Sequence, residues 1–183
     1  MRGKSHISLG QYLLEQYLPD LPGHYRKAFL FGCIQPDRNP ATYLKGSFRF
    51  QWLRGHNYPN ASRFMHRIAG RLENKKKLKL YDFYTLGKLI HYTADAFTHA
   101  HNPSFSKPLW AHRAYEARLH TCFLDYLYTN PHVTVRIDLS VMDSIISCHR
   151  EYSTGAGNIH RDCRFALEAC CCVLAVLLTP KII

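Results

Sequence analysis

The chain has 183 residues, which is enough for one domain with a substantial core and too few for two ordinary domains. Apolar residues make up 46% of the sequence, and glycine and proline are sparse, so wholesale disorder and collagen-like or low-complexity structure are excluded. Lysine and arginine number 24 against 13 aspartates and glutamates, and the formal net charge of +11 predicts binding to anions such as the phosphates of lipids, nucleic acids or small esters.

Apolar positions recur at helical spacing along most of the chain, and each such stretch predicts a helix. In chain order the predicted helices are residues 6–18, 24–34, 60–73, 81–99, 109–128, 138–152 and 159–178. The turn-rich string at residues 36–40 ends the second of them, which places Asp37 at a helix exit.

The segments between these helices carry few signals of other structure. Residues 41–58 are aromatic and loop-like, residues 74–77 form a charged connection, and residues 133–137 are the only strand candidate. No linker divides the chain. We therefore predict an all-α fold, a single domain over residues 1–183 built as a bundle of six or seven helices.

Seven cysteines are present, an odd number that includes the consecutive Cys170, Cys171 and Cys172. Without any CxxC pair, a thiolate zinc site or a thioredoxin motif is not predicted, and the cysteines are interpreted mostly as small buried hydrophobes in a reducing compartment. The basic amino-terminal segment is followed by no apolar region typical of a signal peptide. These features predict a cytoplasmic protein.

The longest apolar run, Ala169 to Leu178, is about half as long as a bilayer span requires. A buried terminal helix is the favoured interpretation, and a membrane-leaning or acylated cysteine tail is the alternative. Arg71 with the lysines at 75–79 forms either a solvated face or a surface for peripheral contact with an anionic membrane. No protein partner is predicted.

Twelve histidines are unusual for this length and point first to metal binding. His91 and Asp95 lie four residues apart, so a helix presents both on one face, and His112 and Glu116 repeat this arrangement on the next predicted helix. Each pair alone is also explained as an ordinary helix-surface interaction. Two pairs on consecutive helices, with more histidines between them, favour a zinc-type site.

Further candidate ligands lie between and before these pairs: His99, His101, Asp37, His56 and His6. The order Pro36-Asp37, His56-x-Tyr58, His91-Tyr92-x-x-Asp95 with His101 downstream, then His112-x-x-x-Glu116, resembles the bacterial zinc-dependent phospholipase C family. The wider superfamily includes fungal single-strand nucleases. The resemblance covers residues 5–120 and implies an all-helical bundle with up to three zinc ions clustered in a cleft.

The resemblance also implies a division of ligands among the three ions. Asp37, His56, His91 and Asp95 match the ligands of one zinc. Asp95 also matches the bridge to a second zinc, for which His6 is the best further match and His24 the alternative. The ligands of the third and most solvent-open zinc are matched by His101, His112 and Glu116, with His99 competing with His101.

Three departures from the family pattern stand out. The secreted lipases supply the amine of an amino-terminal tryptophan to the second zinc, whereas this chain has Met1 and no tryptophan nearby, so that site is expected to be incomplete, or filled by water or another side chain. Histidine stands at residue 99 where the family commonly has proline. A separate membrane-docking domain, present in some members, has no counterpart here, so substrate preference does not transfer.

The resemblance implies a zinc-dependent phosphodiester hydrolase, most plausibly one that cleaves the glycerol–phosphate bond of a phospholipid. Clustered dications lower the pKa of water and neutralise phosphate oxygens, and Asp37, or a water on the zinc ions, would relay the proton. A second hypothesis is a nuclease, or a hydrolase of small phosphate esters. A third is a non-catalytic, metal-binding or membrane-associated helical protein.

Overall fold

The structure is a computed structural model that describes residues 1–42, 56–102, 105, 108–129, 133, 135 and 140–178. In these residues it contains seven α-helices, two short 3₁₀ turns and no strand, which confirms the predicted all-α fold. The helices are α1 (Gly3–Tyr17), α2 (Gly23–Arg38), α3 (Tyr58–Glu73), α4 (Leu80–Ala96), α5 (Leu109–Thr129), α6 (Val141–Ser153) and α7 (Ile159–Leu178), and the 3₁₀ turns are η1 (Pro40–Thr42) and η3 (His99–His101).

Two predicted helix boundaries near the histidines are wrong. α2 continues through Pro36 to Arg38 instead of ending at residue 34, which places Asp37 in its last turn. Proline lacks the amide proton but its fixed φ suits a helix, and Pro36 is buried here, so tertiary packing overrides the break signal. α4 ends at Ala96, three residues before the predicted end. Most of the predicted aromatic loop and of the strand candidate lies outside the described residues.

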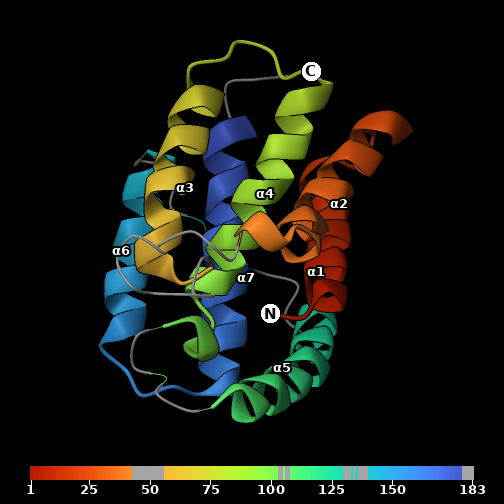
Figure 1. Ribbon diagram of the computed structural model, residues 1–183. Helices are drawn as coiled ribbons and strands as arrows, with labels where there is room; N and C mark the ends of the chain where they lie inside the picture. The colour runs from red at the N-terminus through yellow and green to blue at the C-terminus, as the bar shows by residue number, and fades with distance from the viewer. Residues whose placement is uncertain are drawn as a thin grey trace.

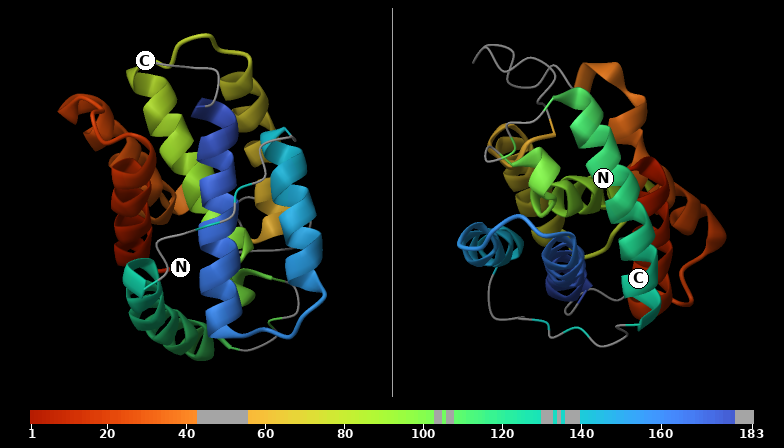
Figure 2. Two further views of the ribbon diagram at one scale, coloured as in Figure 1. Left: turned by 180° about the vertical axis from the view of Figure 1, so that it is seen from behind. Right: turned by 90° about the horizontal axis from the view of Figure 1, so that it is seen from below.

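The helices surround a central pair formed by α4 and α7 (Figure 1). α1 and α2 pack together on one side of this pair, and α3 and α6 pack together on the other. Seen from behind and from below, α5 runs along the lower end of the molecule against α1 and α7 (Figure 2). Buried apolar side chains from all seven helices form one hydrophobic cluster.

α7 supplies a large part of this cluster, because it is buried on most of its circumference. The three consecutive cysteines are at most 3% exposed and form no disulfide, in agreement with their interpretation as buried hydrophobes. Among the described helices none has the length and apolar character that crossing a membrane requires.

Two glycines let α2 and α4 cross at very short range. A Cβ atom on Gly32 would lie 2.1 Å from the carbonyl oxygen of Tyr84, and one on Gly87 would lie 2.1 Å from that of Phe29. Only a residue without a side chain allows backbones to approach so closely. One turn beyond Gly87, this contact brings the ring of His91 against α2, where its Nδ1 donates a hydrogen bond to the carbonyl oxygen of Cys33 at 2.8 Å.

Candidate metal centre

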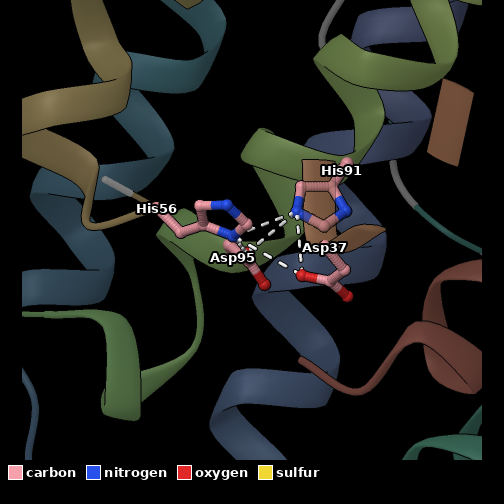
Figure 3. Close-up of side chains that lie close together, drawn as sticks. All are labelled: Asp37, His56, His91 and Asp95. Atoms are coloured by element: carbon pink, nitrogen blue, oxygen red, sulfur yellow. Dashed lines mark hydrogen bonds and ion pairs between the residues drawn. The ribbon is translucent and has the colours of Figure 1, made fainter. Parts of the chain in front are cut away.

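Four of the predicted ligands converge from three separate parts of the chain. Asp37 comes from the end of α2, His56 from the residues before α3, and His91 and Asp95 from one face of α4 (Figure 3). One ligand atom from each lies within 4.8 Å of those of the other three. His56, His91 and Asp95 are buried, and the side chain of Asp37 is 23% exposed.

The separations within this group match the edges of a zinc site. His56 Nδ1 and His91 Nε2 are 3.3 Å apart, and each lies 3.3 Å from Asp95 Oδ2. Asp37 Oδ1 lies 3.6 Å from the same nitrogen of His56 and 3.7 Å from that of His91. Ligand atoms about 2.1 Å from a tetrahedral zinc ion lie about 3.4 Å from one another.

Neighbouring oxygens orient both imidazoles toward this point. His91 Nδ1 donates to Cys33, which leaves the lone pair of Nε2 facing the group. His56 Nε2 lies 3.0 Å from the hydroxyl oxygen of Thr42, and that hydroxyl donates to the carbonyl oxygen of Pro36 at 2.6 Å. Outer contacts of this kind fix the tautomer and the ring orientation of metal-binding histidines.

Asp95 faces a different set of donors with each of its two oxygens. While Oδ2 faces His56 and His91, Oδ1 lies 3.3 Å from His6 Nε2 and 3.7 Å from His101 Nε2. The carboxylate is fully buried. A carboxylate shared between two metal ions would need donor atoms beside each of its oxygens, as Asp95 has. His6, in the first turn of α1, lies beside Oδ1, where the second ion would bind.

The amino nitrogen of Met1 also contacts Asp95 Oδ1, and it lies 3.2 Å from Glu116 Oε1. Burial opposes its positive charge, but the carboxylates of Asp95 and Glu116 outweigh burial and raise its pKa to about 11. Sequence reasoning did not assign this atom, because a backbone nitrogen leaves no side-chain pattern. It lies where the family resemblance expects the amine of a tryptophan.

The remaining three predicted ligands form a second group on the side of α5. His101 Nε2 lies 3.2 Å from Glu116 Oε1, and His112 Nδ1 lies 3.8 Å from Glu116 Oε2. Ligand atoms of the three residues all lie within 4.8 Å of one another. The side chains of His112 and Glu116 are 24% and 15% exposed, so this group is the more open one. Three protein ligands with solvent access are typical of a catalytic zinc site.

The two alternative histidines lie elsewhere. The ring of His99 packs edge-on against Phe105 and Tyr115, and its backbone amide donates to Asp162. His24 is exposed at the start of α2 and packs against Tyr25. The structure therefore places His101 and His6, rather than these two, beside the acidic ligands.

Buried polar atoms without a hydrogen-bond partner show that the residues fit a metal. Within the described part of the chain, both ring nitrogens of His6 and Oδ2 of Asp95 make no hydrogen bond. Burying such groups unpaired costs about 1–3 kcal/mol each, so they need a partner. The donor set combines imidazole nitrogens with carboxylate oxygens, which is the chemistry that zinc prefers.

The local electrostatics leave these groups ready to bind a cation. Burial, and after it the charge of His91, lowers the pKa of His6 to about 4, and burial also lowers the pKa of His56 and of His112. Burial acts to raise the pKa of Asp95, but neighbouring positive groups hold it well below its usual range. At neutral pH the imidazoles of His6, His56 and His112 are therefore neutral and the carboxylate of Asp95 is ionised, which are the forms that bind metal.

The helical bundle and its two clusters of imidazoles and carboxylates, joined at Asp95, define an all-α protein with a candidate zinc centre. A family model described as zinc-dependent phospholipase C matches residues 5–164. The chain belongs to this family. The match extends past the ligand-bearing helices into α6 and the start of α7, beyond the range in which the motifs lie. No curated protein and no solved structure shows significant similarity to the chain.

Proposed function

We propose that the protein is a zinc-dependent phospholipase C that hydrolyses the bond between the glycerol oxygen and phosphorus of a phospholipid. The oxygen of a water molecule forms the new bond to phosphorus, and the bond from phosphorus to the glycerol oxygen breaks. That oxygen leaves with a proton, so the products are diacylglycerol and the phosphorylated headgroup. Family membership and the shared position of Asp95 between two donor groups support this proposal.

Zinc, when bound, would lower the pKa of water and neutralise charge on the phosphate oxygens. Three ions are proposed. The first would be held by Asp37, His56, His91 and Asp95, and the second by His6 and the shared Asp95. The third would be held by His101, His112 and Glu116. Among the four carboxyl and imidazole groups at the first position, Asp37 is the one that solvent reaches. Asp37 is therefore proposed to accept the proton of the attacking water.

The observation that carries the proposal is the set of buried nitrogen and oxygen atoms around Asp95 that lie about 3.3 Å apart and include atoms without a hydrogen bond. The test measures zinc per chain by elemental analysis and release of phosphorylated headgroup from phospholipid, for the wild type and for His91→Ala. We expect more than one zinc per wild-type chain, and loss of both zinc and hydrolysis in the variant. A zinc-supplemented protein that contains no metal would contradict the proposal.

The same metals would also serve a nuclease, and the net charge of +11 is compatible with nucleic acid. A paired assay with phospholipid and single-stranded DNA distinguishes the two substrates, and turnover of DNA alone would overturn the choice of lipid. We further propose a cytoplasmic location with peripheral contact to anionic membrane, in keeping with the free thiols and the basic surface.

A further inference from the structure

A groove of about 650 Å³ lies between α1, α2 and α5, and Asp37 of the candidate metal centre is one of the residues that line it. Asp37 connects the groove to the metal centre, because it lines the groove and its Oδ1 faces His56 and His91. The backbone of α1 passes close by, since a Cβ atom on Gly3 would lie 3.7 Å from Asp37 Oδ2. A substrate in this groove would therefore end at the first group of ligands.

The charged side chains along the groove are mainly basic. Lys4 from α1 and Arg38 from α2 line it and are exposed, and His120 lines it from α5. Asp37 is the only carboxylate among the described residues that line it, and it belongs to the candidate metal centre. Its charge is offset once a cation is bound, which leaves the groove positive.

Apart from Gly3 and Ser8, the uncharged lining is aliphatic. Ile7, Ile34 and Leu124 contribute apolar surface, and no phenylalanine, tyrosine or tryptophan is found among the described lining residues. Quaternary ammonium groups are recognised by the faces of aromatic rings, assisted by negative charge. The groove offers neither feature to a choline headgroup, and Lys4 and Arg38 would repel one.

We propose that this groove receives the headgroup of an anionic glycerophospholipid and that the enzyme prefers such lipids to phosphatidylcholine. This inference rests on the proposed phospholipase activity and names its substrate class. Lys4 and Arg38 attract the net negative charge of the substrate, and the hydroxyls of a glycerol headgroup find hydrogen-bond donors on the same two side chains. Discrimination arises from attraction to one headgroup and repulsion of the other.

The test compares hydrolysis of dihexanoyl phosphatidylglycerol and dihexanoyl phosphatidylcholine, both kept below their critical micelle concentrations, by the zinc-loaded full chain. Two repulsive charges beside the headgroup predict kcat/KM about tenfold or more higher for phosphatidylglycerol. Lys4→Glu and Arg38→Glu should each lower this ratio several-fold. Lys27→Glu, at an exposed position of α2 outside the groove, makes the same change in net charge and should leave the ratio unaltered.

Equal or better hydrolysis of phosphatidylcholine by the wild type overturns the inference, and so does a ratio that neither groove variant changes while zinc content stays normal. If the zinc-loaded protein hydrolyses neither lipid, the proposed phospholipase activity fails, and calorimetric titration then tests the groove separately. Tighter binding of phosphatidylglycerol that is lost in Lys4→Glu supports the headgroup site, and equal binding of both lipids excludes it.

Discussion

His6 has a buried imidazole whose two nitrogens make no hydrogen bond within the described residues. Its ring stacks on that of His91, with centroids 3.9 Å apart, and its Nε2 faces Asp95. The contact with Asp95 offsets only part of the desolvation of this ring, so holding it in the metal-free fold costs stability. A bound metal ion would supply the partner that these nitrogens lack.

Replacing His6 by leucine should therefore have opposite effects on the metal-free and metal-loaded proteins. The chelated variant should be as stable as the chelated wild type, or more stable by about 1 kcal/mol, because an unpaired polar ring has been removed. The gain in stability on adding zinc should shrink. Urea denaturation with and without chelator measures both quantities.

His24→Leu provides the matched control, since His24 is exposed and lies outside both ligand groups. It should leave the zinc-dependent gain intact. A chelated His6→Leu protein that is several kcal/mol less stable than the wild type would show that the imidazole has a structural partner, and would argue against its assignment as a ligand.

At the scale of helices, the crossing of α2 and α4 positions the first ligand group. Gly87→Ala would press a methyl group into the backbone of α2, so the helices must separate, at a cost of about 1–3 kcal/mol or more. Separation also weakens the hydrogen bond from His91 to Cys33 and should reduce zinc affinity. Denaturation of the chelated protein and zinc competition titration measure the two effects.

Gly70→Ala makes the same change in α3, where the added Cβ would meet no atom within 4 Å. It should stabilise the protein by about 0.5–1 kcal/mol, because alanine has the higher helix propensity. Opposite signs for the two variants are the expected result. If Gly87→Ala and Gly70→Ala had similar effects on stability and zinc affinity, the close approach of α2 and α4 would not control the geometry of the candidate metal centre.

Asp162, near the start of α7, links the elements that carry the second group of proposed ligands, which comprises His101, His112 and Glu116. Its Oδ2 accepts hydrogen bonds from the backbone amide of His99 at 2.7 Å and from the hydroxyl of Tyr115 at 2.8 Å, and its Oδ1 accepts one from Tyr152 at 2.7 Å. One carboxylate thus joins η3, α5 and α6 to α7. Tyr115 directly precedes Glu116, so Asp162 helps to position that ligand group.

Asp162→Asn should lower the zinc content by about one ion per chain, because an amide cannot accept from all three donors and η3 is released, at a cost of about 1–3 kcal/mol. Asp82→Asn is the matched control: Asp82 is equally buried near the start of α4 and pairs with Lys75, far along the helix from His91. It should lose stability but keep its zinc. Equal loss of zinc in both variants would reduce Asp162 to a general structural role.

For the whole molecule, periodicity and composition predicted the helices well because most of them bury one face in a common core. The proximity of His91 to Asp95 and of His112 to Glu116 could be predicted for a similar reason, since four-residue spacing on a helix is a local property. The residue at which α2 ends could not be predicted from the sequence, because burial of Pro36 depends on tertiary packing. The sharing of Asp95 and the place of Met1 depend on how distant segments meet, which no local pattern contains.

Zinc should stabilise the entire fold, because the proposed ligands from α1, α2, α4 and α5 lie close together and the unfolded chain does not bring them together. At a free concentration about 1,000 times the dissociation constant, one occupied site contributes about 4 kcal/mol. A chain of this size then gains about 8–16 °C in melting temperature per site.

Calorimetry with a chelator, and again after zinc is restored, measures this change in melting temperature. Magnesium is the control, because it prefers oxygen ligands and should restore little of the lost stability at imidazole-rich sites. His112→Ala should retain most of the zinc-dependent gain, since the fully buried ligands around Asp95 are unchanged, and should lose only the part contributed by the more open group. A melting temperature insensitive to chelation would mean that the buried imidazoles and carboxylates are held by the fold alone.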